Sequence, residues 1–403
     1  VTVYPQVDGG DISASQTICY GEDVAPFTSV TPATGGSGSI TYTWQYTTNM
    51  TAPVGDAAWQ DINTAHGLGY DHGTLTTTTR FVRKAVDASC STPVYSDILT
   101  VTVRPVLSGG TIRSDQTICY GDDVARFDNV TLASGGGGSF TYSWYYTTNL
   151  LATPGGADWI PVPSANGTSY NHGTLTASTK FIRRAVNATC PTPVYSNEVV
   201  VTVRPETDGG EIAESRTICY GEDVPPFTST EDASGGSNSF TYTWFLTTNM
   251  TAVPGGPGWT QINSSNNRVY DHGTLTQTTR FVRRAVDAAC NDPEYGNVIT
   301  ITVRPQLSGG AVTADQTICY GDDVATFQSS SSASGGGGTF TYTWQYTTDM
   351  TAAPGAPGWT DIFPSNSLTY NHGTLTETTR FVRKAVEATC NTPVYSNVIK
   401  VTV

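Results

Sequence analysis

The sequence predicts an all-β protein made of four tandem antiparallel β-sandwich repeats arranged in a rod. Three observations predict this fold. The same motifs return with a period of 100 residues, apolar and polar residues alternate within short segments, and Gly, Pro, Asn and Asp gather between those segments. Thr and Ser are abundant beside 41 Gly, a composition that favours strands and turns over helices.

The repeat is read from strings that recur without insertion or deletion. Thr-Ile-Cys-Tyr-Gly begins at Thr17, Thr117, Thr217 and Thr317. The opening Val-Thr-Val also matches residues 101–103, which suggests that the chain continues a longer array. The predicted repeats are 1–103, 104–203, 204–303 and 304–403.

Period-two alternation identifies the strands. In residues 40–46, Ile40, Tyr42, Trp44 and Tyr46 share one face, and Thr and Gln occupy the other, as in a half-buried strand. Further strands are expected at 81–86, 95–103, around Ile18 and at 59–62. The apolar face makes one Trp of each repeat a core residue: Trp44, Trp144, Trp244 and Trp344.

The joints between repeats are short. Val101-Thr102-Val103-Arg104-Pro105 leads into Gly109-Gly110 with no Gly/Ser linker. Because Pro fixes its own φ and restricts the preceding residue, a joint of this kind is expected to be stiff. Stiff joints between sandwiches predict the rod.

The eight cysteines occur twice per repeat, with the core Trp between them. A bond that joins an early and a late strand beside a Trp is the immunoglobulin-like arrangement, and it predicts pairing within each repeat. A competing scheme joins Cys90 to Cys119 across the joint. Both schemes imply an oxidising, extracytoplasmic compartment. The predicted bonds are Cys19–Cys90, Cys119–Cys190, Cys219–Cys290 and Cys319–Cys390.

Charge and hydropathy exclude two classes of partner. The formal net charge is −14, which repels the phosphates of nucleic acids and anionic lipid. No run of about 18 apolar residues is present, so no membrane insertion is expected. The basic residues Arg80, Arg83 and Lys84 lie on one strand and are expected to meet acidic loops.

The recurring histidine is the natural candidate for a catalytic base. His72 follows Asp71, but His172 follows Asn171, and a catalytic acid should not alternate with an amide. A turn closed by Gly73 explains the motif more simply. We therefore expect neither catalysis nor a cofactor.

A pair of adjacent carboxylates follows the first cysteine of every repeat. Such a pair could bind Ca²⁺ together with backbone carbonyls, or form a solvated turn. The pattern lacks the alternating Asp residues of a calcium loop, so calcium is a weak hypothesis. The residues concerned are Glu22, Asp23, Asp122, Asp123, Glu222, Asp223, Asp322 and Asp323.

A second Trp of each repeat follows a loop rich in Pro and Gly. Packing at an edge of the core is one interpretation, and an exposed platform for a sugar ring is the other. The residues are Trp59, Trp159, Trp259 and Trp359.

The combined motif resembles a known family. It runs from Thr17-Ile18-Cys19 through the Tyr-Thr-Trp-Gln-Tyr strand to Phe81-x-Arg83-x-Ala85-Val86 and Cys90. This order is similar to the immunoglobulin-like tandem repeats of giant Bacteroidota cell-surface adhesins, of the gliding-motility adhesin type, which are cargo of the type IX secretion system. The resemblance covers all four repeats and implies an extracellular, cell-surface protein.

Two functional classes follow. The first is a structural stalk that spaces an adhesive tip from the cell, with further copies of the repeat in a longer parent chain and self-association into fibres. The second is a lectin-like array in which weak carbohydrate-binding repeats act by avidity. The near-identical, uninterrupted copies favour the stalk.

Overall fold

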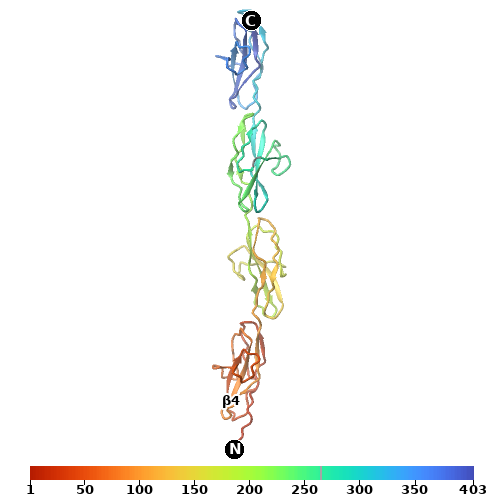
Figure 1. Ribbon diagram of the computed structural model, residues 1–403, viewed down its shortest axis with the longest axis vertical. Coiled ribbons are helices and arrows are strands. Elements are labelled where there is room, and N and C mark those ends of the chain that lie inside the picture. Colours follow the sequence, from red (N-terminus) through yellow and green to blue (C-terminus); the bar gives the residue numbers. More distant parts are fainter. Residues whose placement is uncertain (264–265) are drawn as a thin grey trace. The chain divides into compact units, whose positions relative to one another are not determined.

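Two long antiparallel strands form the centre of every repeat (Figure 1). The computed structural model describes residues 1–263 and 266–403. In repeat 1, β2 (Ile40–Thr47) pairs with β4 (Thr79–Asp87) from Ile40–Asp87 to Thr47–Arg80. The equivalent pairs are β10 (Phe140–Thr147) with β12 (Thr179–Asn187), β19 (Phe240–Thr247) with β22 (Thr279–Asp287), and β28 (Phe340–Thr347) with β30 (Thr379–Glu387).

Four shorter strands complete each main sheet. In repeat 1, β3 (Gln60–Ile62) pairs with β2, while β6 (Leu99–Val103) and β5 (Val94–Tyr95) pair with different parts of β4. β1 (Gln16–Ile18) adds to β6 in parallel, which gives the order β1-β6-β4-β2-β3. The counterparts of β3 are β11 (Ile160–Pro161), β20 (Thr260–Ile262) and β29 (Thr360–Ile362). Those of β6 are β14 (Val199–Val203), β24 (Ile299–Val303) and β32 (Ile399–Thr402). Those of β1 are β8 (Gln116–Ile118), β16 (Arg216–Ile218) and β26 (Gln316–Thr317), and those of β5 are β13 (Val194–Tyr195), β23 (Pro293–Tyr295) and β31 (Pro393–Tyr395).

A smaller second layer closes each sandwich. In repeat 1 it is held by isolated bridges, such as Ile12–Ser29 and Phe27–Tyr70. In the other repeats, parts of this layer form short paired strands. These are β7 (Thr111–Ile112) with β9 (Asn129–Thr131), β15 (Glu211–Ile212) with β18 (Ser229–Glu231), β17 (Asp223–Val224) with β21 (Gly273–Thr274), and β25 (Ala311–Val312) with β27 (Ser329–Ser331).

The core lies between the two layers. Trp44 is fully buried against Phe27, with ring centroids 5.6 Å apart, and its Nε1 donates to the Gly67 carbonyl oxygen at 3.1 Å. Phe81 also packs against Phe27, with ring centroids 4.8 Å apart. The other central Trp residues, Trp144, Trp244 and Trp344, are also fully buried. The prediction of an all-β chain of immunoglobulin-like sandwiches is confirmed.

Arg83 is a buried core residue that the sequence did not suggest. It lies opposite Trp44 in the sheet register and is fully buried, although we expected it to meet acidic loops. Its guanidinium instead donates to the Thr31 carbonyl oxygen at 3.0 Å and lies over the Tyr42 ring at 5.0 Å. Further hydrogen bonds join it to Ser29 Oγ, Gly9 O and Leu68 O.

The other two basic residues of β4, Arg80 and Lys84, have different kinds of partner. The Arg80 guanidinium donates to the Ala52 carbonyl oxygen at 2.9 Å. Lys84 is the member that meets an acid, since its Nζ lies 3.9 Å from Asp61 Oδ1. The expectation of acidic partners therefore applies to Lys84 and is wrong for Arg83.

The chain divides into two units, Val1–Arg204 and Pro205–Val403, and each unit holds two repeats. No helix in the described residues is long and apolar enough to cross a membrane.

Candidate functional site: the disulfide junction between repeats

The disulfides join neighbouring repeats, so the predicted pairing within each repeat is wrong. Cys19 of repeat 1 is bonded to Cys190 of repeat 2, with their Cα atoms 5.8 Å apart. Cys219 and Cys390 form the same bond in the second unit. Cys119 and Cys290 are also disulfide-bonded, whereas Cys90 and Cys319 are free thiols. The alternative Cys90–Cys119 pairing is therefore wrong as well.

The sheet topology explains why Cys19 cannot reach Cys90. β1 ends at Ile18, which pairs with Val103, and β4 begins beside that end because Thr79 pairs with Val101. Cys90 follows the far end of β4, a strand of nine residues. At about 3.4 Å per residue the two cysteines lie roughly 30 Å apart, whereas a disulfide needs Cα atoms within about 7 Å. Each repeat therefore carries one cysteine at each end.

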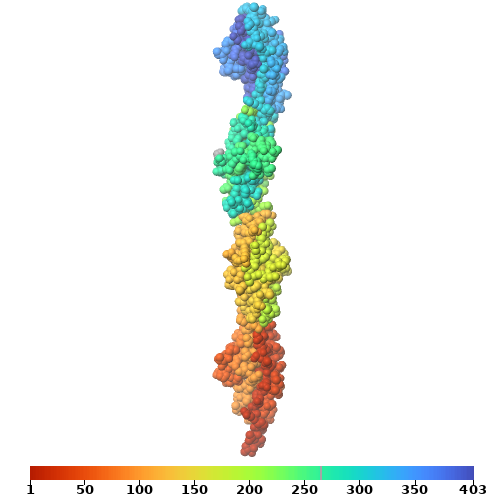
Figure 2. All heavy atoms as spheres, turned by 90° about the vertical axis from the view of Figure 1, so that its right-hand side faces the viewer, coloured from red at the N-terminus to blue at the C-terminus, as the bar shows by residue number. Residues whose placement is uncertain are grey.

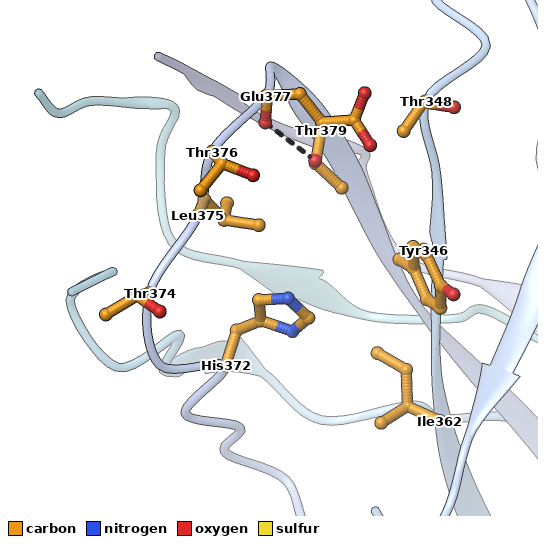
Figure 3. Close-up of a pocket in the computed structure, with 9 residues that line it drawn as sticks. All are labelled: Tyr346, Thr348, Ile362, His372, Thr374, Leu375, Thr376, Glu377 and Thr379. Atoms are coloured by element: carbon orange, nitrogen blue, oxygen red, sulfur yellow. Dashed lines mark hydrogen bonds between the residues drawn. The ribbon is translucent and has the colours of Figure 1, made fainter. Parts of the chain in front are cut away.

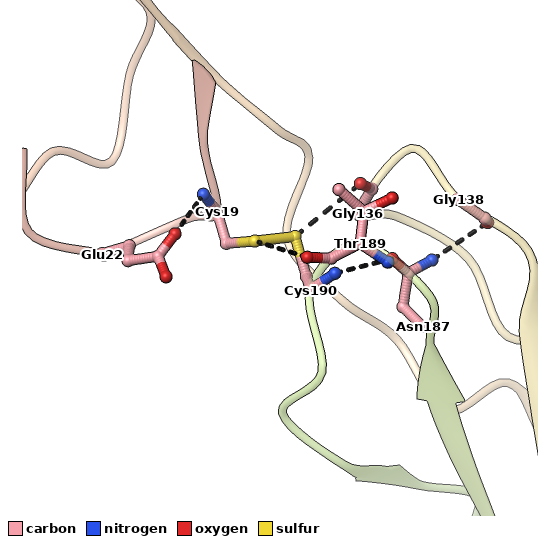
Figure 4. The surroundings of a disulfide bond; sticks show 7 residues. All are labelled: Cys19, Glu22, Gly136, Gly138, Asn187, Thr189 and Cys190. Carbon is pink, nitrogen blue, oxygen red and sulfur yellow. Dashed lines mark hydrogen bonds between the residues drawn. A yellow bond between two sulfur atoms is a disulfide. The ribbon is translucent and has the colours of Figure 1, made fainter. Parts of the chain in front are cut away.

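Each cysteine is positioned by an oxygen-bearing side chain three residues away (Figure 4). The Cys19 backbone N–H donates to Glu22 Oε2 at 2.8 Å. The N–H of Cys190 donates to Asn187 Oδ1 at 2.9 Å, and Asn187 Nδ2 in turn donates to the Gly138 carbonyl oxygen at 2.9 Å. These contacts hold the two loops that carry the bonded sulfur atoms.

The contacts of Glu22 give a structural role to the first carboxylate of each acidic pair. Glu222, Asp122 and Asp322 likewise accept the N–H of the cysteine three residues earlier. In the described residues, no three His, Cys, Asp or Glu side chains are grouped closely enough to hold a metal ion. The carboxylates thus close the turns that present the first cysteines.

The residue three positions before the second cysteine was missed by sequence reasoning. Asp87 is fully buried, and Oδ1 accepts the N–H groups of Ser89 and Cys90, each at 3.0 Å. Its Oδ2 accepts Ser37 Oγ at 2.9 Å, which ties the cysteine loop to the Gly-rich loop. Asn187, Asp287 and Glu387 make the corresponding bonds to the second cysteines of the other repeats. A side-chain oxygen at this position in all four copies was the available signal.

The hydrogen bonds to Asp87 also set its acidity. Burial raises the pKa of a carboxyl group, but the bonds from Ser37, Ser89 and Cys90 outweigh burial and lower the pKa of Asp87 to about 2. Asp87 is therefore ionised at neutral pH, and its charge is stabilised by these N–H and O–H groups.

The joint is bonded to both repeats that it connects. The Arg104 N–H donates to the Ile18 carbonyl oxygen of repeat 1 at 2.9 Å. One residue later, the Pro105 carbonyl oxygen accepts the Gly136 N–H of repeat 2, also at 2.9 Å. Arg304 and Pro305 repeat this pattern in the second unit. Within each unit, the two repeats meet end to end at this joint (Figure 2).

One groove lies beside the Cys19–Cys190 bond and another beside the Cys219–Cys390 bond. At the first junction its volume is about 210 Å³, and at the junction of repeats 3 and 4 it is about 200 Å³. One wall is the first cysteine with the Tyr that follows it, and the other walls belong to the next repeat. The lining residues of the first groove are Cys19, Tyr20, Pro105, Val106, Leu107, Cys190, Thr192 and Val194.

The recurring histidine sits in a packed turn. His72 Nδ1 is hydrogen-bonded to the Tyr70 hydroxyl at 2.9 Å, and its ring lies edge-on to Phe81 at 4.9 Å. Burial lowers the pKa of His72, although Asp71 opposes this, and burial raises the pKa of Tyr70. Both groups are therefore mainly neutral at pH 7.

In repeat 4, His372 lines a cavity of about 280 Å³ together with Tyr346, Ile362 and Leu375 (Figure 3). Glu377 also lines it, but its carboxylate points away from the imidazole. The equivalent positions in the other repeats are Thr77, Ala177 and Gln277, which offer no shared acid. The cavity therefore has no catalytic pair common to the four copies.

The second Trp packs on the outer face of the main sheet. Trp59 is 6% exposed, lies against Val82, and donates from Nε1 to the Pro53 carbonyl oxygen at 2.8 Å. The Arg80 guanidinium covers its ring at 5.5 Å. Trp159 is equally buried, and Trp259 and Trp359 are half-buried beneath Arg280 and Arg380. The sugar-platform hypothesis is wrong for Trp59 and Trp159, because a platform needs an exposed ring.

The same architecture returns in each copy, and one sequence-family model matches each of the four copies. A family model described as a domain of unknown function, DUF8696, matches residues 8–105, 108–205, 208–305 and 308–403. The chain belongs to this family. Within each unit, the junction is thus a contact between one DUF8696 repeat and the next.

Structures of other tandem immunoglobulin domains are similar to this DUF8696 array at low identity. A three-domain titin variant is 11% identical, covers 74% of this chain and 99% of its own, and has a TM-score of 0.36. Sidekick-1 immunoglobulin domains 1–5 are 14% identical, with 99% and 79% coverage and a TM-score of 0.24. The insect immune protein hemolin is 14% identical, with 99% and 100% coverage and a TM-score of 0.25. No curated protein sequence matches the chain.

Proposed function

We propose that this chain is a segment of an extracellular stalk that spaces an adhesive tip from the cell surface. The observation that carries the proposal is the pair of disulfides that join one repeat to the next. A bond within a repeat would stabilise that repeat alone. A bond across a junction holds the orientation of two repeats, which is what a spacer needs.

The joints support the same function. Arg104 and Pro105 are each hydrogen-bonded to a different repeat, so the connection has little freedom to bend even before the disulfide forms. A repeat with strands of five to nine residues is about 35–45 Å long once loops are added. We propose a rod of about 140–180 Å for four such repeats.

The cellular setting is part of the proposal. Disulfides persist in oxidising compartments, which supports an extracellular location. The resemblance of the repeat motif to Bacteroidota surface adhesins favours attachment or gliding motility as the process, with type IX secretion as the export route. A non-enzymatic role agrees with the neutral, turn-bound histidines.

The lectin-like array has weaker support. Its candidate platform residue, Trp59, is buried and capped by Arg80, so no flat aromatic surface is offered to a sugar. We therefore propose that the repeats provide length and stiffness and not repeated sugar-binding sites.

Small-angle X-ray scattering of the oxidised chain tests the stalk. We expect a narrow particle with a maximum dimension of about 140–180 Å. Replacing Cys19 and Cys190 by Ser should broaden the distribution of interatomic distances, because one junction then loses its covalent brace. The matched control is the Cys90→Ser/Cys319→Ser variant, which removes the free thiols and should scatter like the parent. A compact particle, or no change in the Cys19→Ser/Cys190→Ser variant, would contradict the proposal.

A further inference from the structure

A single Asn-Gly dipeptide occurs in the sequence, and it lies in a loop of repeat 2. Asn166 and Gly167 are both exposed to solvent. The same two positions hold His66-Gly67 in repeat 1, Asn266-Asn267 in repeat 3 and Asn366-Ser367 in repeat 4. The loop of repeat 2 therefore has a reactivity that the other copies do not share.

An asparagine that precedes glycine can modify itself. Its side-chain carbonyl carbon lies within reach of the next backbone nitrogen, and glycine has no Cβ to obstruct the approach or to restrict φ and ψ. The reaction also needs both groups to be free to move. In the part of the chain that the structure describes, neither the Asn166 side chain nor the Gly167 N–H makes a hydrogen bond. Both requirements are met.

Asn187, in the same repeat, shows the opposite situation. It precedes the small residue Ala188, but its side chain is only 1% exposed. Its Nδ2 donates to the Gly138 carbonyl oxygen, and its Oδ1 accepts the Cys190 N–H. A side chain held by these bonds cannot turn toward the next backbone nitrogen, whereas Asn166 has no such restraint.

The loop that contains Asn166 supplies acceptors to two core residues. The Gly167 carbonyl oxygen accepts Nε1–H of Trp144 at 2.9 Å. The next carbonyl oxygen, of Thr168, accepts a guanidinium N–H of Arg183 at 2.8 Å. Trp144 and Arg183 are fully buried. The backbone position directly after Asn166 therefore determines whether these two buried donors keep their acceptors.

We propose that Asn166 and Gly167 form a self-modification site, at which Asn166 becomes isoaspartate and the core of repeat 2 is loosened. Isoaspartate routes the main chain through the former side chain, which inserts one methylene group between residues 166 and 167. The carbonyl groups of Gly167 and Thr168 are then displaced from Trp144 and Arg183. The neutral amide is also replaced by a carboxylate, which adds to the negative charge of the chain.

The reaction consumes only water. Hydroxide removes the Gly167 N–H proton, and the nitrogen attacks the side-chain carbonyl carbon of Asn166. A carbon–nitrogen bond forms, the bond to Asn166 Nδ2 breaks, and Nδ2 takes a proton from water and leaves as ammonia. Water then opens the resulting succinimide ring. Opening at the main-chain carbonyl gives isoaspartate, and opening at the side-chain carbonyl gives aspartate, so no oxidant or reductant is involved.

Incubation of the full chain followed by peptide mapping tests the site. We expect Asn166 to lose ammonia before any other Asn, and faster at pH 8 than at pH 6, because hydroxide must remove the Gly167 proton. Asn166→His restores the dipeptide of repeat 1 and should abolish the modification. Gly167→Ser restores the dipeptide of repeat 4 and should slow it. The reciprocal change His66→Asn should make repeat 1 reactive as well.

Three outcomes would overturn the assignment of the site. They are an unmodified Asn166 after incubation at pH 8, modification spread equally over Asn166, Asn266 and Asn366, or an unchanged rate in the Gly167→Ser chain. The variants are expected to fold, because each places in one repeat a residue that another repeat already carries at that position.

Hydrogen exchange of the modified chain tests the effect on the core. Amides of β10 should exchange roughly tenfold faster once isoaspartate has formed, because the loop loses its hydrogen bonds to the core. Asn166→Asp has the same added charge but an unaltered main chain, and should exchange like the parent. Parent-like exchange in the modified chain, or equally fast exchange in Asn166→Asp, would contradict the loosening by the inserted methylene.

Discussion

Arg83 shows how a single charged residue can be accommodated in the core without an acid. Its guanidinium is fully buried, and its charge is stabilised by carbonyl and hydroxyl oxygens from three loops together with the Tyr42 ring. Burial lowers the pKa of Arg83 from its ordinary value. A guanidinium stays protonated in proteins all the same, so the oxygens must supply the stabilisation.

Removing this cation should be costly. We expect Arg83→Ala to destabilise repeat 1 by about 3–5 kcal/mol, because the carbonyl oxygens of Gly9, Thr31 and Leu68 lose their buried donor. Denaturant unfolding followed by hydrogen exchange of repeat 1 peptides measures the loss. Arg126→Ala, at an exposed arginine, is the control and should change stability by less than about 0.5 kcal/mol.

Asn187 should control how easily the first junction is reduced. Asn187→Ala leaves the N–H groups of Thr189 and Cys190 without their acceptor, so the loop that carries Cys190 should loosen and Cys19–Cys190 should reduce at a lower dithiothreitol concentration. Asn187→Asp keeps an acceptor for these N–H groups but loses the donor to the Gly138 carbonyl oxygen, so its sensitivity should lie between those of the parent and Asn187→Ala. Thiol labelling with peptide mapping reads out the reduction. Equal sensitivity of the two variants would contradict this positioning role.

Acid should destabilise repeat 1 more than repeat 2. The pKa of Asp87 falls to about 2 in the folded protein, below its ordinary 3.8, so its ionised form stabilises repeat 1. That stability is fully present above about pH 4 and is lost as the pH falls through about 2. Repeat 2 has the neutral Asn187 and lacks this dependence.

Pulse digestion with pepsin at pH 4 and pH 2 measures this difference. Cleavage within repeat 1 should rise more steeply on acidification than cleavage within repeat 2. Asp87→Asn should remove the difference. An unchanged difference in that variant would show that another group is responsible.

At the scale of the element, the position of β4 could be predicted well, but its effect on the distance between the two cysteines of a repeat could not. Alternation located the strand and its apolar face, and the observed strand is longer than the predicted one by two residues at its start and one at its end. What the pattern did not show is that β4 separates the two cysteines of a repeat by its full length. That separation depends on the parallel pairing of β1 with β6, a long-range contact without a local sequence signal.

The loop before β3 is a second element whose role depends on its packing. It folds back so that Ala52 and Trp59 cover Val82 on the outer face of the main sheet. The polar residues of that face were expected to be exposed to solvent. Gln45 is instead buried, and its Nε2 donates to Asp61 Oδ1 at 2.6 Å. The sequence left both interpretations of Trp59 open, because a Trp that follows a loop can pack against the sheet or point into solvent.

We expect Trp59→Ala to destabilise repeat 1 by about 3 kcal/mol, since a large buried side chain leaves a cavity. Trp259→Ala should cost less, because that Trp is half-buried in repeat 3. Hydrogen exchange of each repeat compares the two. A glycan-binding screen that shows binding dependent on Trp59 would contradict the structural role.

At the scale of the whole molecule, the 100-residue period does not determine how the cysteines pair. Every copy has its two cysteines in the same phase, so a bond within a repeat and a bond to the next repeat are equally consistent with the period. The position of each cysteine at one end of a sandwich removes this ambiguity. The strands, the core Trp residues and the oxidising compartment could be inferred without that information.

The span of these bonds, 171 residues in each case, determines where tension would travel if the chain were pulled at its ends. The shortest covalent route passes from Cys19 directly to Cys190, follows the backbone to Cys219, and crosses directly to Cys390. It contains roughly 60 residues, or about 200 Å of extended backbone. All the remaining residues lie in closed loops that carry no tension.

Pulling should therefore gain almost no length by unfolding a repeat, so force does little work against the native state. In force spectroscopy, the oxidised chain should stop extending near 200 Å, close to the length of the proposed folded rod. After reduction it should reach about 1,400 Å, the contour of 403 residues. Stepwise release of full repeats under oxidising conditions would contradict this route. Staggered bonds would then let the proposed stalk withstand drag even while its individual repeats unfold and refold.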